Sequence, residues 1–108
     1  MKFARFSVFI IMSVALVLST AGFAAAQDDA AALYKSKCQV CHGADGKGDT
    51  PAGKKVGVKD FHSPEVAKAS DTELFEITKK GKDKMPAYDK KLTDDQIKAL
   101  VKYIRSLK

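Results

Sequence analysis

The sequence has few of the features that would stabilise a large domain. No stretch alternates apolar and polar residues as a half-buried strand does, and no internal repeat is visible. The chain has no tryptophan and two cysteines. Large apolar side chains are few after the first 26 residues, and chains below about 70–80 residues usually need a disulfide, a metal or a cofactor to supplement such a core. The sequence therefore predicts a small all-α domain that depends on a bound group.

The first 26 residues differ from the rest. Lys2 and Arg5 precede an apolar run over residues 6–18, and a small-residue site follows at Ala24-Ala25-Ala26. This order is typical of a secretory signal peptide. The alternative is an uncleaved membrane anchor, but the run is shorter than the ~20 residues that a spanning helix needs. We expect cleavage after Ala26 and export to the periplasm.

The remaining residues, 27–108, are expected to form one domain with no membrane span. The whole chain has a net charge of +6, which falls to +4 without Lys2 and Arg5. Most of the basic residues are lysines that alternate with acidic ones, as on an ordinary solvated surface. This mild positive balance does not favour a nucleic-acid partner. We expect the domain to be a monomer.

Cys38, Cys41 and His42 form a C-x-x-C-H motif. Two thiols one turn apart can add to the two vinyl groups of a single porphyrin. The histidine that follows at once can then present a ring nitrogen to the iron. This spacing indicates attachment of one c-type haem, with His42 as a ligand of its iron.

Three other chemistries could use the same residues. A thioredoxin-like C-x-x-C needs a βαβ setting, of which the sequence shows no sign. A zinc site needs four ligands, which His62 would complete, but adjacent Cys41 and His42 would bind one ion poorly in tetrahedral geometry. A plain disulfide between Cys38 and Cys41 is possible in an exported protein.

A second axial ligand is expected from Met85, the only methionine outside the first 26 residues. Iron in cytochromes c is held by histidine and methionine. Pro86 biases Met85 toward extended backbone, and the neighbouring residues lack the apolar periodicity of a core helix. A core methionine that fills a gap is the alternative for Met85, and His62 is the rival ligand. His62 precedes a helix start, so we interpret it as a surface or capping residue.

Four helices are expected around these residues. The first covers 28–37 and leads into Cys38. The second starts at Ser63 and ends by residue 70. The third begins at the capping box of Ser70 and ends at Gly81, and the fourth begins at the capping box of Thr93. Residues 43–58 are glycine-rich and are predicted to be a loop that approaches a flat ring closely. Residues 82–91 are predicted to be an irregular connector.

The motif at residues 38–42, the Met85-Pro86 pair and the first and last helices resemble a small class I cytochrome c of the bacterial single-haem type. The resemblance covers residues 28–108. It implies a cytochrome c fold, about four helices around one covalently bound haem, in which the first and last helices cross beside the ring. Tyr34, and Leu100 with Tyr103, match the aromatic positions near that crossing. Ala30 stands where the family usually has glycine, which implies helices that cross slightly farther apart.

The resemblance also implies a second partner for the haem-ligand histidine. In the family a proline carbonyl accepts a hydrogen bond from this histidine, and Pro51 is the candidate here. Such a partner orients the ring and tunes the metal.

The resulting expectation is a soluble electron-transfer protein that carries one electron at a time between redox partner proteins. With His42 and Met85 on both sides of the iron, no position is open to a substrate, so we expect no enzyme activity. Lysines near Met85, namely Lys79, Lys80, Lys82, Lys84, Lys90 and Lys91, could steer an acidic partner. The alternatives are an ordinary lysine face, a haem-based ligand sensor from which Met85 dissociates, and an electron-entry subunit of a larger periplasmic oxidoreductase.

Overall fold

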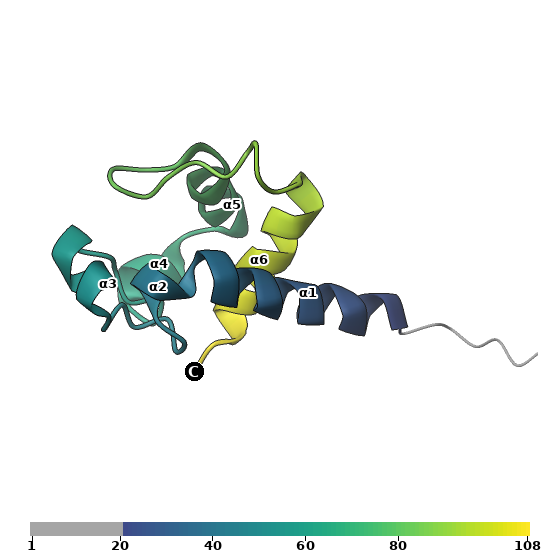
Figure 1. Cartoon of the computed structure of the whole chain (residues 1–108), viewed down its shortest axis with the longest axis horizontal. Helices are drawn as coiled ribbons and strands as arrows, with labels where there is room; N and C mark the ends of the chain where they lie inside the picture. Colours follow the sequence, from purple (N-terminus) through teal and green to yellow (C-terminus); the bar gives the residue numbers. More distant parts are fainter. Residues whose placement is uncertain (1–20) are drawn as a thin grey trace, which may run out of the picture.

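The computed structural model of the chain describes the backbone of residues 21–108 and the side chains from Asp29 onward. Within this range the chain is helical and contains no strand, only an isolated bridge between Lys82 and Met85. The helices are α1 (Ala21–Lys37), α2 (Gln39–His42), α3 (Pro51–Val56), α4 (Pro64–Lys68), α5 (Asp71–Lys80) and α6 (Asp94–Ser106). Figure 1 shows α1 crossing α6, with α5 on one side of this pair and the short helices α2, α3 and α4 beside the carboxyl end of α1.

The core forms where α1 crosses α6. Ala30 and Tyr34 are each 1% exposed and lie four residues apart on one face of α1. Ile97 and Leu100 of α6 are fully buried, and the Tyr34 and Tyr103 rings lie 5.2 Å apart between centroids. The predicted apolar stripe of α6 and the aromatic pair at the crossing are confirmed. The methyl group of Ala30 is accommodated in this contact.

The predicted helix starts from Ser63 onward are confirmed. Ser63 and Ser70 accept hydrogen bonds from Val66 N–H and Glu73 N–H, respectively. Thr93 and Gln96 form a complete capping box at the start of α6, because each side chain binds the other residue's backbone N–H. At the start of α5, the structure contains the bond from Glu73 N–H to the Ser70 hydroxyl, which is one of the two bonds of a capping box. The helix that was expected to end by residue 70 ends at Lys68, as predicted.

Two predictions about the first half of the chain need correction. Within the described residues, helix α1 covers Ala21–Lys37 and so extends before Asp28, because the alanines that precede Asp28 are strong helix formers. Residues 43–58 are not loop throughout, since they contain α3. The described residues therefore form six helices where about four were expected, and the two additional ones are the short helices α2 and α3.

The expected signal peptide, residues 1–26, lies mostly outside the described residues. Among residues 21–108, no helix is long and apolar enough to cross a membrane.

Candidate haem-attachment site

The turn from Cys38 to His42 continues the path of α1. Cys38 N–H donates to Tyr34 O at 2.9 Å, and His42 N–H donates to Cys38 O at 3.0 Å. These helical bonds bring both thiols and the imidazole into one turn. Cys38 and Cys41 are unbonded, so the disulfide alternative finds no support in the structure. Burial raises the pKa of the Cys38 thiol to about 11, which keeps it protonated at neutral pH.

Tyr34 fixes the end of this turn. Its buried hydroxyl donates a 2.6 Å hydrogen bond to the carbonyl of Gly43, the residue after His42. The tyrosine therefore ties the turn to the face of α1 that packs on α6. Burial raises the pKa of the Tyr34 hydroxyl, so the group remains a donor at neutral pH.

His42 is half-buried, and its ring makes no hydrogen bond to any other residue of the described range 29–108. Its Nδ1 atom is buried without a partner. The Phe61 ring stacks on the imidazole, with 4.6 Å between centroids and 21° between planes. Burial lowers the pKa of His42, so the imidazole is neutral at neutral pH. Neutral imidazole is the form that binds a metal.

The hydrogen bond expected from His42 to the carbonyl of Pro51 is absent, because Nδ1 has no partner. Pro51 is the first residue of α3. In a regular helix its carbonyl points along the axis toward the N–H four residues later, which here belongs to Lys55. The prediction for Pro51 is therefore wrong in this structure.

Helix α3 packs on the attachment turn through Thr50 and Gly53. The Thr50 hydroxyl donates to Cys41 O and accepts from Gly53 N–H, each at 2.9 Å. A Cβ atom on Gly53 would lie 2.2 Å from Cys41 O and 2.6 Å from Gly48 O. Glycine is therefore required at this contact, because real Cβ atoms do not approach oxygen so closely.

Phe61 reaches His42 because the glycine-rich segment folds back on it. Phe61 N–H donates to Gly46 O at 2.9 Å. Gly46 has a φ of +75°, and a Cβ atom there would lie 2.6 Å from the Phe61 ring. The backbone at Gly46 thus lies close to an aromatic side chain, whereas the expected approach of this segment to the flat ring of a haem stays a prediction.

Met85 lies on a tight reversal after α5. Its N–H donates to Lys82 O at 2.9 Å, and its carbonyl accepts from Lys82 N–H at 3.2 Å. Gly81 precedes this reversal with a φ of +77°, and a Cβ atom there would lie 2.8 Å from Met85 O. The described residues thus hold Met85 on an ordered, partly buried segment and not in a helical core.

His62 is engaged elsewhere. It is exposed; its Nδ1 lies 2.7 Å from Asp60 Oδ1, and its Nε2 lies 2.9 Å from Leu107 O. Both ring nitrogens therefore have partners at the surface, as the interpretation of His62 as a surface residue requires. No group of three or more histidine, cysteine, aspartate or glutamate residues in the described part of the chain could hold a metal ion, which gives the zinc alternative no support.

The donor set fits a covalently attached haem. Two unbonded thiols and a neutral imidazole without a hydrogen-bond partner lie in one turn. The sequence indicated no role at the site for Thr50 or Phe61, and for Gly53 it indicated only the approach to a flat ring that was expected of residues 43–58 as a whole. Thr50-Pro51 carries the same N-cap and N1 signal as Ser63-Pro64, so helix α3 could have been predicted. Phe61 gives no local signal, because its contact with His42 depends on how the intervening loop folds.

Comparisons with known proteins agree with this site. Residues 25–104 match the model of the family described as Cytochrome C oxidase, cbb3-type, subunit III. The solved structure titled "KustC0563 c-type cytochrome" is similar with a TM-score of 0.68 and 36% identity, over 74% of this chain and 98% of that one. A second solved structure, of a point mutant of Kustc0563, has a TM-score of 0.67 and 35% identity, over 74% and 99% of the two chains. No curated protein matches the chain.

These likenesses confirm the all-α cytochrome c fold and its covalently bound haem c with iron. They also support haem-based electron transfer as the general function and redox proteins as the general class of partner. The chain belongs to the c-type cytochromes and is a small class I member of them.

Proposed function

We propose that this chain is a periplasmic electron carrier that binds one haem c through Cys38 and Cys41 and holds its iron between His42 and Met85. The observation that carries the proposal is the attachment turn, where two thiols and an imidazole without a hydrogen-bond partner are fixed together. The position of Met85 on a segment shaped by Gly81 supports its assignment as the second ligand.

Each residue has a defined task. Cys38 and Cys41 would hold the haem through thioether bonds to its two vinyl groups. His42 would hold the iron through a ring nitrogen, and Phe61 stacked on the imidazole limits its rotation. Met85 would hold the iron through its thioether sulfur. When bound, the haem supplies the one-electron change of its iron.

The absence of enzyme activity is part of the proposal. Two protein ligands on the iron leave no position for a substrate. The family supports a carrier more than an enzyme. Export through a signal peptide at residues 1–26 is also proposed, since c-type cytochromes are typically exported proteins.

A spectroelectrochemical titration tests this function. The holoprotein should titrate reversibly as a one-electron couple, with a tenfold change in the ratio of oxidised to reduced forms for every ~59 mV. Met85→His should lower the midpoint potential, because methionine ligation raises it. His62→Ala is the control and should leave the potential nearly unchanged. If His62→Ala changed the midpoint potential more than Met85→His did, the second ligand would be His62.

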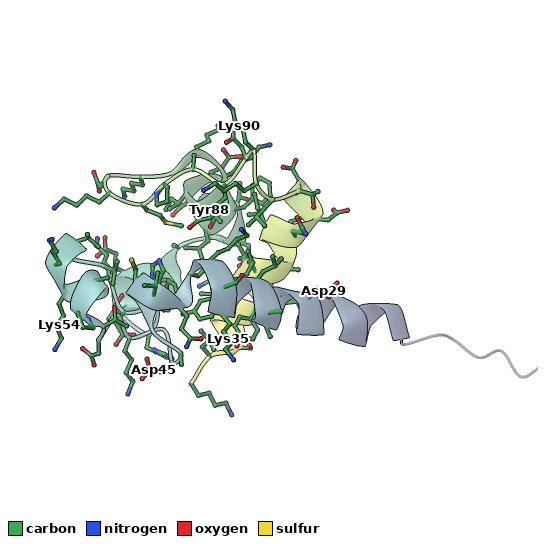
Figure 2. The ribbon with its side chains drawn as sticks, viewed as in Figure 1. Asp29, Lys35, Asp45, Lys54, Tyr88 and Lys90 are labelled. Atoms are coloured by element: carbon green, nitrogen blue, oxygen red, sulfur yellow. The ribbon has the colours of Figure 1, made fainter. Side chains whose placement is uncertain are left out.

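Lysines around Met85 are proposed to steer an acidic redox partner. Lys79 and Lys80 form ion pairs with Asp94 and Glu76, at 3.1 and 2.7 Å. Lys84 and Lys90 are exposed and form no ion pair among the described residues. Figure 2 shows Lys90 at the outer edge of the connection between α5 and α6, with its side chain pointing away from the body. Lys84 and Lys90 are therefore the best candidates.

Salt dependence tests the steering. Transfer to an acidic partner should slow as ionic strength rises, because screening weakens charge attraction. The double variant Lys84→Gln/Lys90→Gln should show a shallower dependence. The pair Lys54→Gln/Lys55→Gln, on α3, is the control. If the transfer rate fell equally steeply with ionic strength in the wild type and in both double variants, Lys84 and Lys90 would have no role in steering.

A second candidate is an electron-entry subunit of a larger oxidoreductase. The description of the matching family names subunit III of a cbb3-type oxidase, and this favours the candidate. Gentle purification from the native periplasm and membranes distinguishes the free carrier from the oxidoreductase subunit. A monomer in the soluble fraction supports the free carrier, and stable co-purification with an oxidoreductase supports the subunit.

A further inference from the structure

Tyr88 lies three residues after Met85 and joins two parts of the haem site. Its hydroxyl donates a 3.1 Å hydrogen bond to the carbonyl of Lys37, the last residue of α1. Lys37 immediately precedes Cys38. Figure 2 shows Tyr88 between the α5–α6 connection and α1. One side chain thus links the segment that carries Met85 to the helix that carries the attachment turn.

The backbone of Tyr88 is held independently of its hydroxyl. Its N–H lies 3.2 Å from both Thr78 O and Lys79 O at the end of α5. Its carbonyl accepts from Lys91 N–H and Leu92 N–H, at 3.0 and 2.9 Å. The main chain at Tyr88 is therefore anchored to α5 and to the segment before α6, and removal of the hydroxyl leaves these anchors in place.

The link to α1 rests on the hydroxyl. Within the described residues, Tyr88 Oη to Lys37 O is the hydrogen bond that joins segment 81–91 to α1 or α2. The ring is half-buried and packs against the core cluster. Burial raises the pKa of the Tyr88 hydroxyl, so the group stays a donor at neutral pH.

We propose that Tyr88 is a positioning residue for Met85, whose hydroxyl holds the Met85 segment against the end of α1 and so keeps the methionine on the iron. This inference rests on the proposed His42 and Met85 ligation. Loss of the bond frees the segment to move away from α1 while its anchors to α5 remain. The fraction of molecules in which Met85 has left the iron then rises.

Binding of imidazole to the ferric holoprotein measures that fraction. An added ligand enters only when Met85 leaves, so its apparent affinity is proportional to the open population. Tyr88→Phe keeps the ring and removes the hydroxyl. Loss of this one hydrogen bond in Tyr88→Phe should increase the apparent imidazole affinity about 2- to 10-fold over the wild type. Tyr103→Phe is the matched control, because the Tyr103 hydroxyl forms no hydrogen bond with the rest of residues 29–108.

The outcomes separate this inference from the proposed function. If the wild-type ferric protein lacks the far-red band of a methionine–iron bond, the proposed ligation itself fails. If the wild type has the band and Tyr88→Phe binds imidazole more tightly than Tyr103→Phe does, the positioning role is supported. Urea unfolding of both variants separates local from global effects. Lower stability of Tyr88→Phe with wild-type imidazole affinity would make the hydroxyl merely structural and overturn the proposal.

Discussion

The ring of Phe61 stacks on the imidazole of His42 with 4.6 Å between centroids and 21° between planes. Phe61 is positioned by a hydrogen bond from its own N–H to Gly46 O. Because Nδ1 of His42 lacks a hydrogen-bond partner, this stack takes on the orienting role that a second hydrogen bond has at many metal sites. The orientation of the proposed iron ligand therefore depends on packing more than on a polar contact.

Replacement of Phe61 should loosen the imidazole. Phe61→Leu retains an apolar side chain but removes the flat surface, so His42 can sample more ring orientations. We expect broader lines, caused by a wider spread of g-values, in the low-temperature EPR spectrum of the ferric Phe61→Leu holoprotein, with the haem still attached. Phe75→Leu, a partly buried position on α5, is the control. Equal line widths in both variants would mean that Phe61 does not orient the histidine.

Loss of the Thr50 hydroxyl should destabilise the attachment turn. Thr50→Val keeps the shape but removes the bond to Cys41 O and the N-cap of α3. We expect a loss of about 1–2 kcal/mol in the free energy of unfolding, the usual cost of a lost N-cap. Urea unfolding of the holoprotein measures it. Thr50→Ser keeps both bonds and should remain much closer to the wild type, and a similar loss in both variants would contradict this account.

An alanine at Gly81 should disturb Met85 directly. With φ +77° and ψ 166°, Gly81 occupies a backbone region that is essentially restricted to glycine and costs another residue roughly 1–3 kcal/mol. The new Cβ would also lie 2.8 Å from Met85 O and 2.9 Å from Ala87 N. We expect Gly81→Ala to weaken the far-red methionine–iron band and to permit carbon monoxide binding to the reduced protein. Gly57→Ala is the control for a positive φ without a steric clash, since Gly57 lies in the left-handed region, with φ +72° and ψ 40°, and has nothing within 4 Å of the new Cβ. An unchanged band in Gly81→Ala would show that the Met85 segment tolerates the displacement.

The contacts of His62 predict a pH-dependent stability. Its two ring nitrogens face acceptors, Asp60 Oδ1 and Leu107 O, so both bonds form only when the imidazole is doubly protonated. The bond to Asp60 raises the pKa of His62, the Leu107 carbonyl adds to this, and Lys47 opposes it.

The sign of the effect follows from the raised pKa. The unfolded value is ~6.5, so the stabilisation by His62 is complete below that pH and is lost as pH rises through the folded value. Urea unfolding of the wild type and of His62→Gln between pH 5 and pH 9 measures it. The wild type should be the more stable at pH 5, and the difference should shrink toward pH 9. A difference that is constant with pH would contradict the charged state of His62.

Local signals predicted much of this molecule. The serine and threonine caps and Gly81 placed the later helices, and the apolar stripe from Ile97 to Ile104 placed the core face of α6. The C-x-x-C-H motif located the attachment turn, because its chemistry depends on residues that are close together in the sequence.

Long-range contacts were not predictable in this way. Phe61 meets His42, and Tyr88 meets Lys37, only after the loops between them have folded. The sequence also did not reveal that His42 Nδ1 lacks a hydrogen-bond partner. That absence depends on the fold, in which Pro51 is the first residue of α3. Sequence patterns thus identified the candidate ligands, whereas their supporting contacts required the fold.

The visible absorption spectrum of the holoprotein tests the central claim most directly. It should be recorded oxidised, reduced, and reduced with carbon monoxide, after maturation in a periplasm with haem-attachment machinery. Ligation by His42 and Met85 predicts sharp reduced bands of a low-spin c-type haem, a weak far-red band when oxidised, and no response to carbon monoxide. A high-spin spectrum that changes with carbon monoxide, or a spectrum without haem bands, would contradict it.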